Sequence, residues 1–190
     1  MRKSRVETAE TRRRIVEVAA EEFRAKGIHA TGLADLMASA GLSHGGFYRH
    51  FDSKDQLVAE ACEAGLTGIV DSLETAADGC NPEEGFKAIV EAYMSTAHRD
   101  APGSGCPLAG MGSELARADD ITRAAATRGF GELVEMLAKR IGNPAEAADH
   151  SRATFALAAM IGAVTLSRII ADPAVSVSLL ENVKQRIEAI

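Results

Sequence analysis

Side chains suited to contacting nucleic acid gather in a short stretch between residues 44 and 54. They are His44, Tyr48, Arg49, His50 and Lys54. Hydroxyl and cationic groups of this kind bind phosphate oxygens, and some of them can also reach base edges. Gly45 and Gly46 stand among them, although each glycine inside a helix costs roughly 1 kcal/mol relative to alanine. Close approach of the backbone to DNA is a reason to tolerate that cost, so the stretch predicts a DNA-contacting surface.

Two short helical patterns joined by a tight turn must position this stretch. Thr31 is a suitable N-cap for the first pattern, and apolar residues follow it at helical spacing for one buried face. Gly41 stands where a helix ends in a left-handed residue, a conformation that glycine adopts at little steric cost. Ser43 can cap a second helix that starts at His44. Two helices joined this closely predict a helix-turn-helix, whose second helix enters the major groove of DNA.

The run from Gly41 to Leu57, Gly-Leu-Ser-His-Gly-Gly-Phe-Tyr-Arg-His-Phe-Asp-Ser-Lys-Asp-Gln-Leu, resembles the N-terminal signature of TetR-family transcriptional regulators. The resemblance covers roughly residues 8–60, and beyond them it rests on length and helical character. An exception is the segment from Gly105 to Leu115, which resembles a segment seen in some branches of the family. The family implies an all-α fold with a three-helix DNA-binding head, residues 1–52. A helical ligand-binding and dimerisation domain, residues 53–190, would follow it.

Helix geometry and side-chain chemistry, together with the resemblance, suggest roles for individual residues of the head. Hydroxyls at helix N-termini and outward-facing side chains would contact phosphate, while His44 and Arg49 would take part in base readout. Phe47 and Phe51 belong in the core. The resulting DNA-binding set is Thr31, Ser43, His44, Gly45, Gly46, Tyr48, Arg49, His50 and Lys54. His44 and Gly46 depart from the family pattern, which more often has lysine and a small residue other than glycine at these places.

Charge is distributed unevenly along the 190 residues. Residues 1–54 hold ten lysines and arginines against seven acidic residues, a net charge of +3, whereas the whole chain carries −6. A basic N-terminal part on an acidic body is the asymmetry expected of a local DNA-binding head. The alternative from charge alone is a solvated basic tail.

Other function classes find little support in the sequence. The three cysteines lack the spacing of a metal site or a disulfide framework, and the five histidines show no metal-ligand pattern. No catalytic residues, metal or cofactor are therefore expected. The N-terminus does not resemble a signal peptide, and the longest charge-free apolar stretch, residues 153–167, is shorter than the roughly 20 residues of a membrane span. We expect a cytoplasmic protein that does not enter a membrane.

Helical patterns and turn signals fill the remainder of the chain. A first helix with Ile15, Ala19 and Phe23 on its inner face would end at Gly27 and support the helix-turn-helix. Ser53 can cap a long helix that follows the head. The helices expected beyond the head span about residues 54–75, 83–98, 108–118, 120–141, 146–171 and 173–188.

The last two expected helices carry apolar residues on more than one face, which suggests a partner. A two-fold homodimer that pairs these helices is what the resemblance implies. Its interface would include Phe155, Met160, Val164, Leu180 and Val183. The alternative is a deeply buried helix in a monomer.

The middle helices supply apolar and sulfur-containing side chains that suit a small-molecule pocket. The candidate residues are Phe86, Tyr93, Met94, Cys106, Met111, Phe130 and Leu133. The alternative is that these residues are ordinary core.

These patterns together predict a DNA-binding regulator, by default a repressor that a small-molecule effector releases from a palindromic operator. One alternative is a redox- or electrophile-sensing regulator, because a helix N-terminus at Cys106 would lower the pKa of its thiol. Another is a helical module that binds another protein and no DNA.

Overall fold

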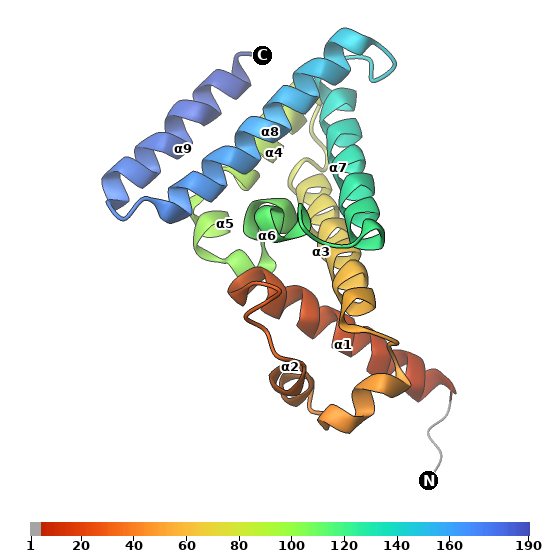
Figure 1. The fold of residues 1–190 in the computed structure, drawn as a ribbon. Coiled ribbons are helices and arrows are strands. Elements are labelled where there is room, and N and C mark those ends of the chain that lie inside the picture. The colour runs from red at the N-terminus through yellow and green to blue at the C-terminus, as the bar shows by residue number, and fades with distance from the viewer. Residues whose placement is uncertain (1–4) are drawn as a thin grey trace.

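The computed structural model describes residues 5–190, and over this range the chain folds into helices without a strand (Figure 1). Residues 1–4 of the expected head lie outside the described part. The elements are α1 (Arg5–Lys26), α2 (Leu33–Ser39), the 3₁₀ helix η1 (His44–Arg49), α3 (Lys54–Ala76), α4 (Pro82–Tyr93), α5 (Thr96–Asp100), the 3₁₀ helix η2 (Pro102–Ser104), α6 (Pro107–Leu115), α7 (Asp120–Ile141), α8 (Ala147–Ile169) and α9 (Pro173–Glu188).

The head forms around a stripe of fully buried residues on α1, with Ile15, Ala19 and Phe23 pointing inward as expected. Phe47 and Phe51 close the core from the other side, with their rings stacked 5.5 Å apart. Gly41 has φ +71°, the left-handed conformation predicted for the turn between the two units. The second unit, however, is a short 3₁₀ helix and not the α-helix that its spacing suggested.

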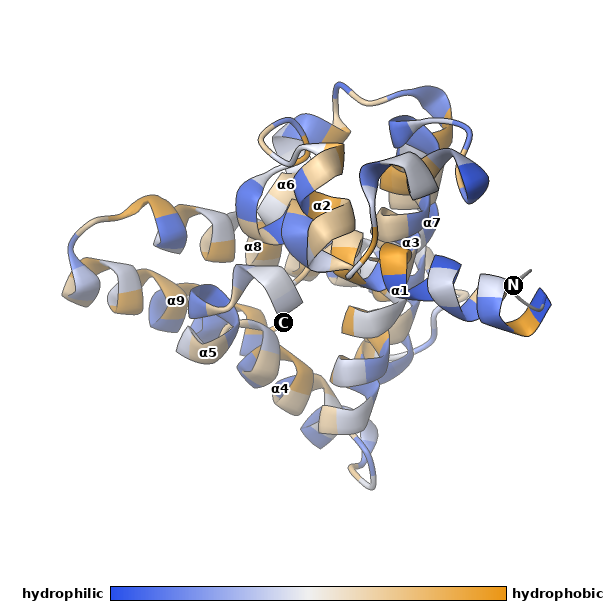
Figure 2. Ribbon diagram, turned by 90° about the horizontal axis from the view of Figure 1, so that it is seen from below, coloured by the Kyte–Doolittle hydropathy of each residue, from blue (hydrophilic) through white to orange (hydrophobic). Residues whose placement is uncertain are grey.

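The body is a stack of long helices that begins with α3. As expected, the Ser53 hydroxyl caps this helix by accepting a hydrogen bond from the Gln56 backbone N–H at 3.0 Å. From the head, α3 runs into the body beside α7, and α7, α8 and α9 follow in layers (Figure 1). Seen from the head side in Figure 2, α8 and α9 form the flank opposite the N-terminus.

The helix expected over residues 83–98 is in fact two helices, because the chain turns after Tyr93. Ser95 is extended, and its hydroxyl accepts a hydrogen bond from the His98 backbone N–H at 3.1 Å, which starts the new helix α5. Serine competes well for such a cap position, whereas periodicity alone cannot register the break. As a result, α5 lies against α8.

Helix α6 lies between the body and the head (Figure 1). The backbones of α6 and α1 approach closely at Gly110, where a Cβ atom would stand 3.5 Å from the carbonyl oxygen of Arg24. The Arg24 Nε also donates a hydrogen bond of 2.7 Å to the Gly103 carbonyl of η2. The head therefore contacts the body through α6 and η2 as well as through the continuous chain of α3.

Helix α8 is long and apolar enough to cross a membrane by length and composition. Within the fold it packs against α7 and α9, with Ala153, Met160 and Val164 fully buried. The core helix of a soluble protein meets the same criteria, so these properties do not indicate a membrane protein.

Candidate nucleic-acid interface

The outer surface of η1 presents polar side chains above a buried aromatic base. Tyr48 is 67% exposed, and its ring stands edge-on to the buried Phe47 at 5.1 Å. Ser43, His44 and Arg49 are exposed beside it. Ser43 occupies the N-cap position of η1, but its hydroxyl makes no capping hydrogen bond. This surface therefore combines hydroxyl, imidazole and guanidinium groups, all of which can contact DNA.

Two residues expected at phosphate positions are held inside the head. Thr31 is buried, and its hydroxyl donates to the Gly27 carbonyl at 2.8 Å, while Gly32 takes the N-cap position of α2. The Lys54 Nζ donates to the carbonyls of Ile28 and Thr31 at 2.6 and 2.7 Å. The expected N-cap role of Thr31 was therefore wrong, whereas DNA contact by Thr31 and Lys54 stays a prediction. Their polar groups satisfy the loop between α1 and α2, which would otherwise leave buried carbonyls unpaired.

His50 is half-buried and is positioned by a residue that the sequence analysis did not single out. Arg12 of α1 donates from Nε to the His50 carbonyl at 3.2 Å, and from Nη2 to Glu60 of α3 at 2.6 Å. The same guanidinium lies over the Phe51 ring at 4.6 Å. Arg12 thus joins three elements of the head. No sequence signal distinguishes it from the neighbouring arginines of α1, because all its partners lie far along the chain.

Gly45 and Gly46 are not required by packing within the protein. Neither has a positive φ, so the backbone conformation is open to any residue. A Cβ at Gly45 would meet nothing within 4 Å, and one at Gly46 would make ordinary contact with Met37 at 3.7 Å. The missing side chains leave the backbone of η1 accessible on the exposed surface. This agrees with the expectation that another molecule approaches the backbone here.

A carboxylate of the body holds the loop that leads into α2. Glu114 of α6 accepts hydrogen bonds from the backbone N–H groups of Ile28 and His29, at 3.1 and 3.0 Å, and its carboxylate lies 2.9 Å from the His29 Nδ1. Burial raises the pKa of the Glu114 carboxyl, but the hydrogen bonds from His29 and Ile28 outweigh it and leave the pKa below its ordinary value. The carboxylate is therefore the stable form of this link.

The fold and the head geometry agree with the families that the sequence matches. Residues 15–61 match the family described as "Bacterial regulatory proteins, tetR family", and residues 82–176 match "Transcriptional regulator LmrA/YxaF-like, C-terminal domain". The chain belongs to the TetR family of transcriptional regulators. This is a family of DNA-binding regulators and not of enzymes.

Individual relatives support this membership. The HTH-type transcriptional regulator Rv0196 of Mycobacterium tuberculosis is 30% identical over 176 residues, which cover 85% of this chain and 86% of the relative. The HTH-type transcriptional repressor KstR2 of Rhodococcus jostii is 33% identical over 92 residues, 46% of this chain and 41% of that protein. A TetR regulator from Chloroflexus aurantiacus has a crystal structure with a TM-score of 0.79 at 26% identity, covering 96% and 94% of the two chains.

In this TetR-family regulator the residues expected to bind a ligand are mostly packed in the core. Phe130 is half-buried, and the others are almost completely covered by their neighbours: Phe86, Tyr93, Met94, Cys106, Met111 and Leu133. The structure brings Tyr93 and Cys106 together, whereas Phe86 lies at the other end of α4. The set is therefore not the lining of one open cavity.

Cys106 is buried at the N-cap of α6, and the expected lowering of its thiol pKa is wrong. Burial raises the pKa of the thiol, and the neighbouring Tyr93 hydroxyl and the backbone N–H groups of α6 offset this rise only in part. A thiol that is neutral and covered reacts slowly with oxidants and electrophiles. The geometry therefore gives little support to a sensor built on Cys106.

The residues expected at a dimer interface divide into two groups. Met160, Val164 and Leu180 are buried in the core of the chain itself, so their side chains are not available to a partner. Phe155 is 63% exposed, and Val183 is half-buried. Met160, Val164 and Leu180 were wrongly expected at the interface because α8 and α9 carry apolar residues on more than one face. Periodicity does not tell which face of such a helix the chain covers with its own helices.

Proposed function

We propose that this TetR-family protein is a repressor that binds a palindromic operator as a dimer and is released by a small molecule. The observation that carries the proposal is the exposed surface of η1, where Tyr48 and Arg49 stand beside a backbone left open at Gly45. The related KstR2 is named a transcriptional repressor, which supports this direction of control. Operator binding would take place in the cytoplasm.

Dimerisation is supported by a stripe of apolar and small residues on the outer face of α8. The stripe consists of Phe155, Ala159, Gly162, Leu166 and Ile169, of which Ile169 is 72% exposed. Alternating steps of four and three residues are the spacing of a seam between two helices. A Cβ at Gly162 would meet nothing within 4 Å, so a second helix can approach closely there. Val175 and Val177 extend the exposed apolar surface onto α9.

A two-fold dimer would place its two heads on successive major grooves, with half-sites about 34–36 Å apart or a multiple of that distance. An effector that changes the separation of the heads would weaken this fit. For release, the effector must bind the non-DNA-competent state more tightly, because equal affinity shifts no equilibrium.

Two helices connect the body with the head and could carry this movement. The sequence suggested α3, which runs without interruption from Lys54 into the body. The structure adds α6, whose Glu114 holds the loop at Ile28 and His29. A shift of α6 along its axis would act directly on the loop that orients α2.

The proposal is tested by selecting binding sites from random duplex DNA with the full chain. We expect a near-palindromic sequence, a complex that contains two chains, and affinity that falls steeply with salt. Failure to retain any duplex above the level of a protein of similar charge would favour the alternative, a helical module that binds another protein.

A further inference from the structure

Two glycines make room for three polar side chains around the segment 105–107. A Cβ at Gly105 would stand only 2.7 Å from the His98 Nε2 and 3.1 Å from the Arg168 Nη2. A Cβ at Gly65 of α3 would collide with the Nη1 of Arg24. Because real Cβ contacts are not this short, these side chains reach the segment only since glycine stands at both positions. The arrangement surrounds Cys106 with a histidine and two arginines.

The Tyr93 hydroxyl is a buried polar group without a hydrogen-bond partner. Tyr93 is 1% exposed, its ring stands edge-on to that of His98 at 4.6 Å, and its hydroxyl makes no hydrogen bond of ordinary geometry. The group beside it is the Cys106 thiol, a weak partner. Nearly all buried polar groups in native structures are satisfied by protein, water or ligand. The free hydroxyl therefore points to a molecule that belongs beside it.

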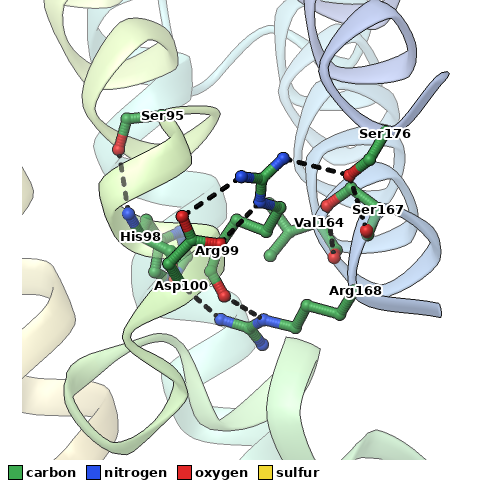
Figure 3. A network of polar contacts seen from close by, with 8 residues as sticks. All are labelled: Ser95, His98, Arg99, Asp100, Val164, Ser167, Arg168 and Ser176. Carbon is green, nitrogen blue, oxygen red and sulfur yellow. Dashed lines mark hydrogen bonds and ion pairs between the residues drawn. The ribbon is translucent and has the colours of Figure 1, made fainter. Parts of the chain in front are cut away.

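Arg168 of α8 directs a second unpartnered donor into the same region. Its Nε and Nη2 donate to the carbonyls of Arg99 and His98 at 2.9 and 2.8 Å, as Figure 3 shows, whereas its buried Nη1 has no partner. Burial raises the pKa of both the Tyr93 hydroxyl and the Cys106 thiol, and the charge of Arg168 opposes this rise in each. The guanidinium is thus close to both groups.

The positive charge of this region is not neutralised by an ion pair. Within residues 5–190, neither Arg168 nor Arg24 forms an ion pair with a carboxylate, although Asp100 and Glu21 act on them through space. Asp100 is itself paired with Arg99 at 2.7 Å. Both guanidiniums are half-buried, and an anionic group placed beside one of them lowers the cost of a partly desolvated charge.

His98 cannot supply the missing acceptor, because both of its ring nitrogens are occupied. The Nδ1 lies 2.6 Å from the Tyr93 carbonyl, to which it donates, and the Nε2 accepts from the Cys106 backbone N–H at 2.9 Å. Burial lowers the pKa of His98, and the charge of Arg168 lowers it further, against the opposing effect of the Tyr93 carbonyl. The imidazole is therefore neutral and fixed in one tautomer.

From these contacts we infer that Tyr93 and Arg168 form a recognition site for the carboxylate of a small organic acid. The carboxylate accepts hydrogen bonds from the Tyr93 hydroxyl and the Arg168 Nη1, which have no other partner. A groove of about 320 Å³ beside Arg168, which offers space for the remainder of the molecule, is lined by Arg99, Asp100, Ser167, Arg168, Ile170, Ala171, Pro173 and Ser176. The Asp100 carboxylate in this lining is already paired with Arg99 at 2.7 Å. The inference rests on the proposed function, since this acid would be the effector.

Titration calorimetry of the full chain with benzoate and hexanoate, and with the uncharged benzamide and hexanamide, tests the inference. We expect the acids to bind at least about tenfold more tightly than the amides, because only a carboxylate neutralises the guanidinium. Equal binding of acids and amides, or no binding of either acid, overturns the inference and leaves the two donors to water only.

Tyr93→Phe separates recognition from folding. Because the hydroxyl has no partner, its loss should leave the melting temperature unchanged or raise it, while the affinity for the acids falls about tenfold. Tyr48→Phe, the same substitution at an exposed position of the head, should leave acid binding unchanged. Full acid affinity in Tyr93→Phe contradicts the assignment. Operator binding is measured in parallel without acid. If the protein binds its operator but no acid, only the proposed class of effector is refuted. If it binds no operator, the proposed function is refuted.

Discussion

Glu114 and His29 are 85 residues apart in the sequence, yet the carboxylate of Glu114 lies within 3.0 Å of both the backbone nitrogen and the Nδ1 of His29. The first residue belongs to α6 of the body, and the second to the loop that leads into α2 of the head. Their contact makes α6 a direct mechanical connection to the helix-turn-helix. The remaining length of α6 leads back to Cys106, beside the unpartnered hydroxyl of Tyr93.

The hydrogen bonds between the Glu114 carboxylate and the loop at Ile28 and His29 should make the stability of the protein depend on pH. The folded-state pKa of Glu114 lies below its ordinary value of 4.5, so the link stabilises the fold above that pH and is lost as pH falls through the lowered pKa. We expect Glu114→Gln to melt at a lower temperature than the unsubstituted protein at pH 7. This difference in melting temperature should become smaller below about pH 4. Glu132→Gln, at an exposed position of α7, is the control. If Glu114→Gln and the unsubstituted protein had the same melting temperature at every pH, a stabilising contact between Glu114 and the loop at His29 would be contradicted.

Gly45→Ala should separate DNA binding from stability. A Cβ there meets nothing in the protein, so the substitution should leave the melting temperature unchanged or raise it slightly. If the backbone of η1 approaches DNA closely, operator affinity should fall about tenfold or more because the methyl group intervenes. Gly131→Ala, an equally open position on α7, should show the stability effect without loss of affinity. If Gly45→Ala bound the operator with undiminished affinity, close contact between DNA and the η1 backbone at Gly45 would be excluded.

Lys54→Met tests whether the lysine serves the fold or the phosphate backbone. Its ammonium group donates to two carbonyls of the loop between α1 and α2. Removing it leaves both unsatisfied, at an expected cost of about 1–3 kcal/mol of stability. The slope of log affinity against log salt should not change. A slope reduced by about 0.9, with an unchanged melting temperature, would instead indicate a phosphate contact.

Tyr48 and Arg49 are adjacent and exposed, and we expect them to contribute differently. Tyr48→Phe removes a hydroxyl expected to contact phosphate, so binding to all duplex sequences should weaken by a similar factor. Arg49→Ala should change which sequence is preferred, by about 1–3 kcal/mol at the position that it reads. Binding-site selection with each variant measures both effects. A changed consensus for Tyr48→Phe with intact nonspecific affinity would reverse the two roles.

Leu166→Glu should give a folded monomer with weak operator binding. Leu166 is 52% exposed within the α8 stripe, so a charge is tolerated by the single chain but not between two closely packed helices. Sedimentation velocity at micromolar concentration measures the mass, and Ile121→Glu, at an exposed position of α7, is the control. Val164→Glu should behave differently and unfold the chain, since Val164 is completely buried. If Leu166→Glu remained a dimer, the α8 stripe would be excluded as the dimer interface.

Local sequence determined the elements of this protein and the character of its head. The left-handed turn at Gly41 and the cap at Ser53 depend on neighbouring residues only, so their type reveals them. Helical apolar spacing placed Phe23 in the core, and the large aromatic ring of Phe47 placed that residue there as well. These features, with the exposed Tyr48, were sufficient to predict a DNA-binding helical protein.

Only the tertiary structure decided which partner each polar side chain takes. Lys54 looked like a phosphate ligand, but it binds carbonyls 23 and 26 residues away, and Glu114 carried no signal of its contact with His29. The sequence also did not determine which face of α8 is left exposed for a second chain. A helix that is apolar on most sides has no single apolar face that must point into the core of its own chain. Contacts between distant residues follow from how the helices pack, and sequence periodicity reports only which face of each helix is apolar.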